Sequence, residues 1–273
     1  MIASAWRPLL RKAARNYVAG PELPDALRLA AKFAERGVPA STLCCWDALD
    51  DVPRHVADMY LATVRAIQSA GLDSYISIKA PSLGFDDGLI TEIAEAARDA
   101  GIRLHFDSLG AEAADRTFQL IERARAYGAP LGCTLPGRWL RSPGDARRAG
   151  QMGLRVRVVK GQWSDPGVAV EPRSGFLDVI DRLAGGTAPV AVATHDPVLA
   201  EAAVRRLQSA GTPCEMELLY GLPSRAALKV ARDLGVPVRY YLPYGYAWLP
   251  YALRQARRDP RILWRVLRDA SRN

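Results

Sequence analysis

The sequence predicts an α/β protein folded as a closed (β/α)8 barrel of the TIM type. Strand-like apolar runs alternate with helical patterns, and several of the helical patterns end in glycine. No strand is followed by the glycine fingerprint of a dinucleotide-binding fold. Strict alternation implies parallel strands joined by right-handed crossovers. Eight such units in 273 residues fit a closed barrel better than an open doubly wound sheet.

Two helical segments precede the barrel. Residues 1–18 form a basic amphipathic pattern that the prolines of residues 21–24 interrupt, and residues 25–35 form a second helical pattern. We expect the first segment to be a surface helix; an organellar presequence is the alternative. Residues 1–38 are therefore assigned to N-terminal helices. No linker divides the chain, so we expect one domain over residues 1–273.

The strands and most of their connecting helices can be delimited from hydrophobic periodicity. We expect strands at residues 41–46, 74–79, 102–107, 130–135, 154–160, 189–194, 214–219 and 237–242. We expect helices at residues 55–70, 87–100, 111–127, 176–184, 197–210 and 224–234. The glycines expected to end helices in a left-handed conformation are Gly71, Gly101, Gly128, Gly153, Gly211 and Gly235.

Composition and charge exclude several classes of protein. The chain is 49% hydrophobic and 24% charged, an ordinary globular composition, and no apolar run reaches the ~20 residues that span a bilayer. The net charge of +8 comes from dispersed arginines, which does not favour nucleic-acid binding but is compatible with weak contact at the inner face of a membrane. The four cysteines lack CxxC or Cys/His spacing, so we expect reduced thiols, a cytoplasmic location and no metal site.

Polar and aromatic side chains gather at the carboxyl ends of the predicted strands. Active sites of (β/α)8 enzymes lie at that end of the barrel, so these side chains can share one site. They are Lys79, Asp107, Arg157, Lys160, Gly161, Trp163, Thr194, His195, Asp196, Glu215, Glu217, Leu219, Tyr220 and Tyr241. Apolar residues would satisfy loop packing equally well, so the concentration of polar groups predicts a functional site.

Each of these groups also has a structural alternative. Arg157 and Lys160, with the Gly161 amide, could hold phosphates or a flavin edge, or form an outward-facing basic strand end. Lys79 and Asp107 could form an ion pair beneath a substrate, or a purely structural pair.

His195 is a further candidate, although a lone histidine after a buried strand is more often a satisfied structural residue. It has no partner histidine or carboxylate spacing that would indicate a metal site. The sequence also lacks a GxSxG motif, a Cys/His pair and a Walker loop. Nucleophilic hydrolysis and phosphoryl transfer are therefore not favoured.

The C-terminal stretch YYLPYGYAWLPYALRQARR predicts a strand, ended by Pro243 and Gly245, and then a helix. Tyr251 and Arg254 lie three residues apart, so they share one helix face. A phenol beside a guanidinium suits a small carboxylate with an apolar body. The alternative is a solvated last helix whose arginines face water.

Several short segments, in the same order along the chain, resemble those of the proline dehydrogenases. The resemblance covers residues 17–268, and its most specific blocks are RVVKGQW and RYYLPYGYAWLPYALRQ. The other segments are YVAG, GVPASTLCCWDALDD, SIK, FDSLGAEAADRT, ATHD and EMELLYG. This family consists of FAD-dependent (β/α)8 enzymes of proline catabolism, which remove a hydride from the ring carbon next to nitrogen and produce an imine.

The resemblance implies a role for each candidate residue. Catalytic roles would fall to Arg157, near flavin N5, and to Lys79 and Asp107, paired beneath the substrate. Noncovalent FAD binding would involve Arg157, Lys160, Gly161, Thr194, His195, Asp196 and Glu217. The substrate would contact Leu219, Tyr241, Tyr251, Trp163 and Gln255, with Arg254 at its carboxylate.

The chain departs from the family pattern inside this site. Gln255 stands where the family has a second arginine, and Arg258 where it has an acid. Trp163 replaces a tyrosine, Asp196 an asparagine, and Glu217 a glutamine that faces the flavin. One lost charged hydrogen bond typically costs ~1.5–3 kcal/mol, so L-proline can be a poor substrate. A carboxylate facing the flavin at position 217 would disfavour an anionic reduced ring.

The sequence therefore predicts a flavin-dependent oxidoreductase that oxidises L-proline, or a related cyclic imino acid or amine, to the corresponding imine. The alternative is a flavin-free relative that acts as a binding or regulatory module. A membrane quinone is a candidate electron acceptor.

Overall fold

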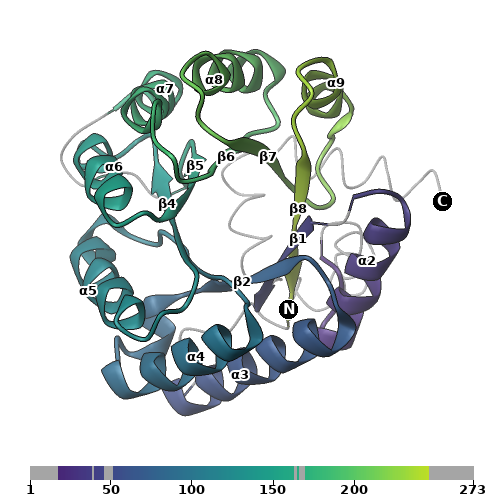
Figure 1. Cartoon of the computed structure of the whole chain (residues 1–273), viewed down its shortest axis with the longest axis vertical. Coiled ribbons are helices and arrows are strands. Elements are labelled where there is room, and N and C mark those ends of the chain that lie inside the picture. Colours follow the sequence, from purple (N-terminus) through teal and green to yellow (C-terminus); the bar gives the residue numbers. More distant parts are fainter. Residues whose placement is uncertain (1–17, 39, 46–51, 163–164, 166–169, 246–273) are drawn as a thin grey trace, which may run out of the picture.

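The computed structural model describes residues 18–38, 40–45, 52–162, 165 and 170–245 as a closed barrel. Eight parallel strands follow one another around the barrel in chain order, and β1 pairs with β8 to close it (Figure 1). The strands are β1 (Ala40–Cys45), β2 (Ser74–Ile78), β3 (Leu104–Phe106), β4 (Leu131–Pro136), β5 (Arg155–Val159), β6 (Val190–Ala193), β7 (Cys214–Leu219) and β8 (Val238–Tyr244). The predicted fold class is thereby confirmed.

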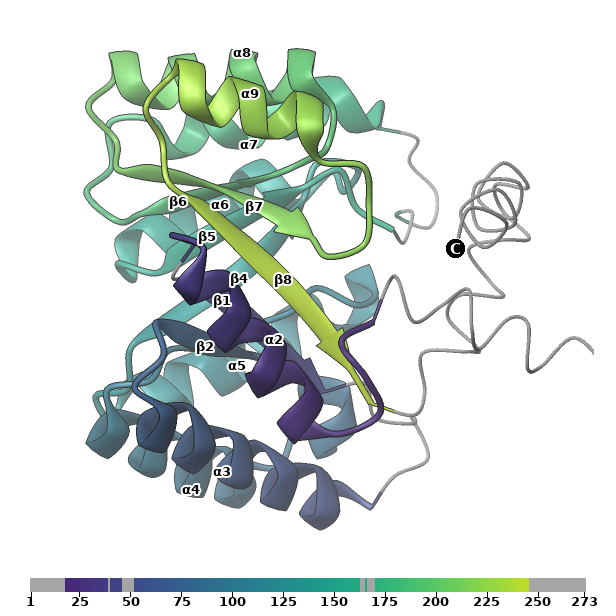
Figure 2. The same cartoon turned by 90° about the vertical axis from the view of Figure 1, so that its right-hand side faces the viewer.

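Helices surround the strands on the outside of the barrel (Figure 1). They are α2 (Leu23–Glu35), α3 (Pro53–Ala70), α4 (Asp87–Ala100), α5 (Ala114–Arg125), α6 (Ser142–Gln151), α7 (Pro172–Leu183), α8 (Pro197–Ser209) and α9 (Arg225–Asp233), with short 3-10 turns η1 (Ala80–Leu83) and η2 (Ala111–Ala113). In Figure 2, α2 lies beside β8, where Phe33 stacks on Tyr240 with 4.5 Å between ring centroids. This contact places the N-terminal helix over the closing strand pair.

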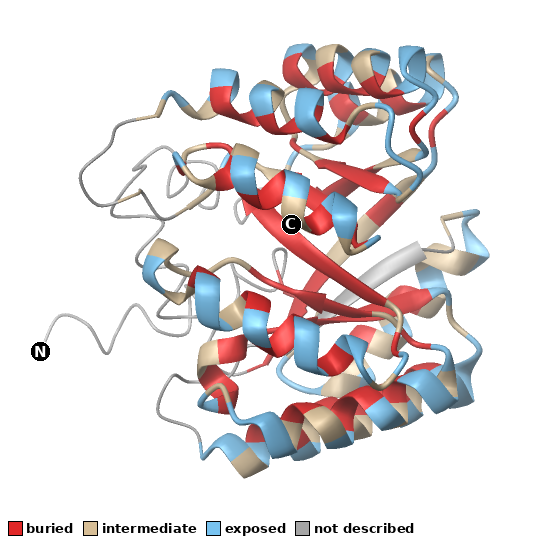
Figure 3. Ribbon diagram, turned by 60° about the vertical axis from the view of Figure 1, so that its left-hand side comes forward, coloured by how far each residue is buried: buried red, intermediate tan, exposed pale blue. Residues whose placement is uncertain are grey.

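The apolar core lies between the strands and the helices, as the buried inner sides of the helices in Figure 3 show. In α4 the buried residues Ile90, Ile93, Ala94 and Ala97 recur at helical spacing and form one apolar face. Outward-facing strand residues cover the opposite side of this layer; the most buried include Ile78, Leu104, Val158, Met216 and Leu218. The pattern follows from the alternation of side chains along a strand.

Left-handed glycines end the helices where the sequence predicts them. Gly71 and Gly101 have φ of 61° and 67° and directly follow α3 and α4. A residue with a Cβ atom is strained in this conformation, so glycine lets the chain turn sharply toward the next strand.

Most element boundaries shift by one or two residues from the prediction, and four elements differ in a way that has a physical reason. The expected helix at 111–127 divides into η2 and α5, and α7 begins at Pro172 rather than at residue 176. Helix α6, SPGDARRAGQ, was not delimited because its proline and glycines hide the helical period. β8 continues through Pro243 to Tyr244; Pro243 lacks an N–H, but its carbonyl accepts from the Ala19 amide at 2.8 Å.

Residues 1–17 of the first expected helix lie outside the described residues, and so does the expected C-terminal helix, residues 248–258. Among the residues that are described, no helix is both long enough and apolar enough to cross a membrane.

Candidate active site

The inside of the barrel is filled by charged side chains that alternate in sign. Arg155 and Arg157 occur two residues apart on β5, as do Glu215 and Glu217 on β7, so each pair points to the same side of its strand. Barrels of this type are usually filled by branched apolar residues, which makes the charged interior a property of this chain. We call the set the ion ladder; in order from the carboxyl ends of the strands it comprises Asp107, Arg157, Glu217, Arg155, Glu215 and Arg239.

Each member of the ion ladder bonds to the next. Arg157 pairs with Asp107 and also donates to Glu217, with 2.7 Å between Nη1 and Oε1. Arg155 Nη2 lies 2.8 Å from Glu217 Oε2 and also pairs with Glu215. Arg239 Nε completes the ladder at 3.0 Å from Glu215 Oε1. Three arginines and three carboxylates balance one another, as charges withdrawn from water require.

Glu217 is the central carboxylate, and its side chain is 1% exposed. Burial by itself would raise its pKa, but Arg157 and Arg155 outweigh burial and bring the pKa to about 2. The Tyr75 hydroxyl adds a third hydrogen bond at 2.5 Å. Glu217 is therefore ionised at neutral pH, and both of its oxygens are occupied.

Tyr75 lies between two arginines of the ladder. The guanidinium carbons of Arg155 and Arg239 are 4.7 Å and 4.9 Å from its ring centroid, within the range of cation–π attraction. Burial raises the pKa of the Tyr75 hydroxyl, so it remains a donor to Glu217.

His105 also lies inside the barrel and is uncharged. Arg155 can only donate, so its contact at 3.4 Å makes His105 Nδ1 an acceptor and leaves the proton on Nε2. That nitrogen donates to Thr134 Oγ1 at 3.0 Å. Burial, followed by the charges of Arg157 and Arg155, lowers the His105 pKa well below its ordinary value.

Three predicted site residues meet at the barrel mouth, which we define as the carboxyl ends of the strands. Tyr241 Oη donates to Asp107 Oδ2 at 3.1 Å, while Asp107 Oδ1 accepts from Arg157. The Arg157 guanidinium carbon lies 4.8 Å from the Tyr241 ring centroid. Its Nε donates to Thr134 at 3.1 Å. Arg157 is thus fixed from several sides.

The predicted ion pair between Lys79 and Asp107 is wrong. Within the described part of the chain, the ion pair of Asp107 is made with Arg157 and not with Lys79. Asp107 and Arg157 both project into the barrel from β3 and β5, and the guanidinium bridges them. Lys79 follows β2 at the mouth, where its backbone amide donates to Tyr60 Oη at 3.0 Å.

His195, Thr194 and Asp196 connect elements of the barrel. The Leu219 amide donates to His195 Nε2 at 3.0 Å, so Nδ1 carries the proton and donates to the Pro223 carbonyl at 3.1 Å. Burial lowers the His195 pKa, which favours this neutral form. Both ring nitrogens therefore bond to backbone, in agreement with the structural alternative for this histidine.

Asp196 caps helix α8. Its Oδ1 accepts from the amides of Val198 and Leu199 at 3.1 Å and 3.2 Å, and its other oxygen pairs with Arg173. Thr194 Oγ1 accepts from the Asp196 amide at 3.2 Å. These contacts account for the carboxylate at this position without a ligand.

A cationic group lies beyond β4 and β5 at the barrel mouth. Gly161 has φ of 93°, and a Cβ there would lie 2.7 Å from Pro136 Cβ, so the close turn requires glycine. Lys160 beside it is exposed. Arg138 packs against the same turn. Its Nη1 donates to Gln162 O at 3.2 Å, and its buried Nε has no hydrogen-bond partner among the described residues.

Arg138 was missed by the sequence reasoning, although it lies in the segment CTLPGRW directly after β4. An orphaned buried donor beside an exposed lysine suits the anionic part of a nucleotide cofactor. The residues present therefore fit a phosphate-bearing group at this point of the mouth.

Of the remaining predicted site residues, the structure describes Leu219 and Glu217. Leu219 ends β7 and is half-buried. Glu217 directs its oxygens to Arg155 and Arg157 rather than out of the barrel. Trp163, Tyr251, Arg254 and Gln255 lie outside the described residues, as does Arg258. No group of three or more His, Cys, Asp or Glu among the described residues could hold a metal ion.

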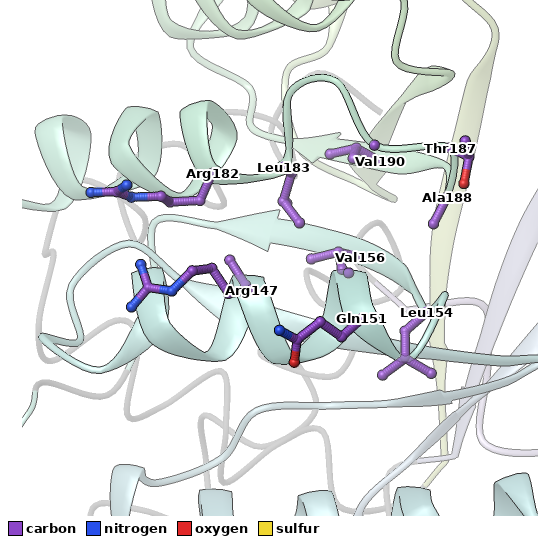
Figure 4. Close-up of a pocket in the computed structure, with 12 residues that line it drawn as sticks. Arg147, Gln151, Leu154, Val156, Arg182, Leu183, Thr187, Ala188 and Val190 are labelled. Atoms are coloured by element: carbon purple, nitrogen blue, oxygen red, sulfur yellow. The ribbon is translucent and has the colours of Figure 1, made fainter.

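A separate crevice of about 240 Å³ lies outside the barrel, between α6 and α7 (Figure 4). Its apolar lining includes Leu154, Val156 and Val190, at the amino ends of β5 and β6, and Arg147 and Arg182 stand at its rim. The crevice is therefore at the opposite end of the strands from the mouth and does not contribute to the candidate site.

Comparisons with known proteins point to one family. The chain is 27% identical over 274 residues to the proline dehydrogenase of Deinococcus radiodurans, covering 91% of this chain and 86% of that protein. It is 24% identical to proline dehydrogenase 1 of Bacillus subtilis strain 168, covering 92% and 88%. No family model matches the chain.

Solved structures show the same fold. Proline utilization A of Bdellovibrio bacteriovorus, inactivated by N-propargylglycine, matches with a TM-score of 0.75 at 15% identity over 89% of this chain. The proline utilization A structure from Corynebacterium freiburgense matches with a TM-score of 0.72 at 17% identity over 96%. This chain spans 32% of each of those longer chains.

Proposed function

We propose that this chain, a distant member of the proline dehydrogenase family, is a flavin-dependent oxidoreductase acting on L-proline or a related cyclic imino acid or amine. The observation that carries the proposal is the grouping of Asp107, Arg157 and Tyr241 at the barrel mouth. All three residues were assigned to the site from the sequence, first by their positions at strand ends and then by the resemblance. FAD, when bound, supplies the hydride acceptor.

The chain's own residues would orient the reactants. Arg157 is held by Asp107, Glu217 and Thr134, and a guanidinium keeps further N–H donors for a ligand. Fixing a donor in this way favours catalysis, because the reacting groups need not be reorganised. Tyr241 and Leu219 would line one side of the substrate pocket. Lys160, Gly161 and Arg138 would bind the anionic part of FAD.

The residues expected on the C-terminal helix complete the proposed substrate site. Arg254 would bind the substrate carboxylate, with Tyr251 on the same helix face and Gln255 beside it. Trp163 would narrow the pocket where the family has a tyrosine. A substrate that differs from L-proline in ring or carboxylate is consistent with these changes.

A flavin-free binding module is the second candidate. It is favoured by the contacts of His195 and Asp196, whose polar atoms are occupied by the protein itself. Two of the expected cofactor-binding residues therefore have structural roles, and Lys160, Gly161, Arg138 and Thr194 would have to supply the remaining contacts.

The visible absorption spectrum of the purified protein separates the two candidates. We expect the bands of oxidised flavin, and we expect acid precipitation to release the flavin, because the proposed binding is noncovalent. Anaerobic bleaching of this spectrum by a panel of cyclic imino acids and amines would then identify the substrate. A protein that stays colourless after incubation with FAD would contradict the proposal and favour the binding module.

The electron acceptor and the location of the protein are also proposals. A membrane quinone would suit a flavoenzyme with a net charge of +8, which favours weak peripheral contact with anionic lipid. Sedimentation with anionic vesicles should decrease steeply with added salt. Equal sedimentation with neutral vesicles would contradict an electrostatic contact.

A further inference from the structure

The ion ladder sets the charge environment of Arg157 at the barrel mouth, and Glu217 is its central carboxylate. Arg157 is the only arginine of the ladder that reaches the mouth residues Asp107 and Tyr241. Its charge is shared between two carboxylates, Asp107 and Glu217. With His105 neutral, the six members of the ladder sum to zero.

We propose that Glu217 is a positioning residue that neutralises Arg157, so that Arg157 presents no net positive charge to a ligand at the barrel mouth. For the flavin this statement rests on the proposed function; for the protein without flavin it does not. The sequence predicted instead that the Glu217 carboxylate faces the flavin directly. The carboxylate acts through Arg157 instead, because both of its oxygens bond to the ladder.

The neighbours of Glu217 suit a carboxylate and not the family's glutamine. Arg155 and Tyr75 donate to Oε2, and Arg157 donates to Oε1. An amide has one acceptor atom and one donor group, so either orientation would turn an N–H toward an existing donor. A chain with glutamine here would also carry an unbalanced arginine in the barrel. The rest of the ladder is thus built around a negative charge at position 217.

Neutralisation has a direct consequence for ligands. An uncompensated Arg157 would attract anions to the mouth and would stabilise an anionic reduced flavin. With Glu217 in place, both attractions are reduced. The site then selects a ligand by shape and by its other contacts more than by a negative charge next to Arg157.

Glu217→Gln tests this inference in two ways. In the protein without flavin, sulfate should raise the melting temperature of E217Q more than that of the wild type at equal ionic strength, corresponding to about tenfold tighter binding. In the flavin-loaded protein, the midpoint potential should rise, by ~30 mV for a tenfold change in a two-electron equilibrium.

Two control variants separate charge from structural damage. Tyr75→Phe removes one hydrogen bond to Glu217 without changing charge, so it should lower stability but leave sulfate binding and potential as in the wild type. The double variant Arg157→Gln with Glu217→Gln restores neutrality and should lose the sulfate response. A merely structural role for Glu217 would not produce this difference.

Other results of these experiments would contradict the proposed role of Glu217 or the proposed function. A folded E217Q with wild-type sulfate affinity, or with an unchanged potential when flavin is bound, would overturn the inference. If E217Q does not fold, Glu217→Leu combined with Tyr75→Phe removes the carboxylate together with a donor that would be left unpaired, and the same sulfate response is expected. A protein that binds no flavin would contradict the proposed function, while the sulfate experiment would still test Glu217.

Discussion

The hydroxyl of Tyr75 on β2 donates a 2.5 Å hydrogen bond to the Glu217 carboxylate on β7, across the inside of the barrel. Neither residue is more than 3% exposed, so water does not replace the bond when it is broken. Two strands that are not neighbours in the sheet are thereby connected through their side chains.

We expect Tyr75→Phe to lower the free energy of unfolding by ~1.5–3 kcal/mol, the usual worth of a hydrogen bond to a charged group. Urea titration followed by circular dichroism would measure it. Tyr240→Phe is the matched control, because that hydroxyl is half-buried and bonds to Ser224 at 3.3 Å. Equal losses in the two variants would contradict a special role for the bond to Glu217.

Stability should decrease on acidification because of His105. Its pKa in the folded protein lies well below the ordinary value of 6.5, so below that pH the unfolded chain binds a proton that the folded chain excludes. The stabilisation is present above about pH 6.5 and is lost as the pH falls toward the folded-state pKa, by up to ~1.4 kcal/mol per pH unit. His105→Gln should flatten this dependence between pH 6.5 and 5. His55→Gln, at an exposed position on α3, should leave it unchanged.

Asp196 distinguishes a helix cap from a cofactor ligand. If its role is to cap α8, Asp196→Ala should cost ~0.5–2 kcal/mol of stability without weakening FAD binding. Asp196→Asn should recover most of the loss, because asparagine also caps helices. Thermal unfolding and FAD titration would measure both quantities. A large loss of FAD affinity with little loss of stability would assign the residue to the cofactor instead.

Two glycines should respond oppositely to alanine. A Cβ on Gly175, in α7, would lie 1.9 Å from the Gly137 carbonyl oxygen, so Gly175→Ala should destabilise by ~1–3 kcal/mol or more. A Cβ on Gly150, in α6, would meet no described atom within 4 Å outside its own helix turn, so Gly150→Ala should stabilise by up to ~1 kcal/mol. Melting temperatures of the two variants would check the pair. A stable Gly175→Ala variant would show that the loop at Gly137 can move away.

The carboxylate site proposed from the sequence gives a functional prediction. Arg254→Ala should raise KM for any carboxylate substrate at least tenfold while FAD remains bound, because it removes the main charged hydrogen bonds. Gln255→Arg should improve kcat/KM for L-proline about tenfold if the missing second arginine limits its use. Unchanged substrate affinity in Arg254→Ala would indicate a substrate without a carboxylate.

The barrel and several of its mouth residues could be predicted because they depend on local sequence patterns. Apolar alternation marks strands, and glycine after a helix marks the turn into the next strand. Asp107, Arg157 and Tyr241 could be placed together, since parallel strands bring their carboxyl ends to one face. Helix α6 was missed because its composition is typical of a loop.

The pairing inside the barrel could not be predicted, because it depends on side chains that meet across the interior. Arg155 and Arg239 lie near the amino ends of their strands, where no site was expected, yet they balance the carboxylates of β7. The partner of Asp107 depends on whether Arg157 or Lys79 comes within ion-pair distance of it. That distance across the barrel cannot be read from the spacing of residues along the sequence.

Closure by β1 and β8 has a consequence for folding. The paired residues Ala40 and Arg239 are about 200 residues apart in sequence, so the contact that closes the barrel is among the most distant in the chain. During synthesis, β1 and β7 expose unpaired edges until β8 has emerged, and exposed edges associate readily with other chains. Glu215 likewise lacks Arg239 until then. The nascent chain therefore depends most on protection from aggregation in the interval before β8 is made.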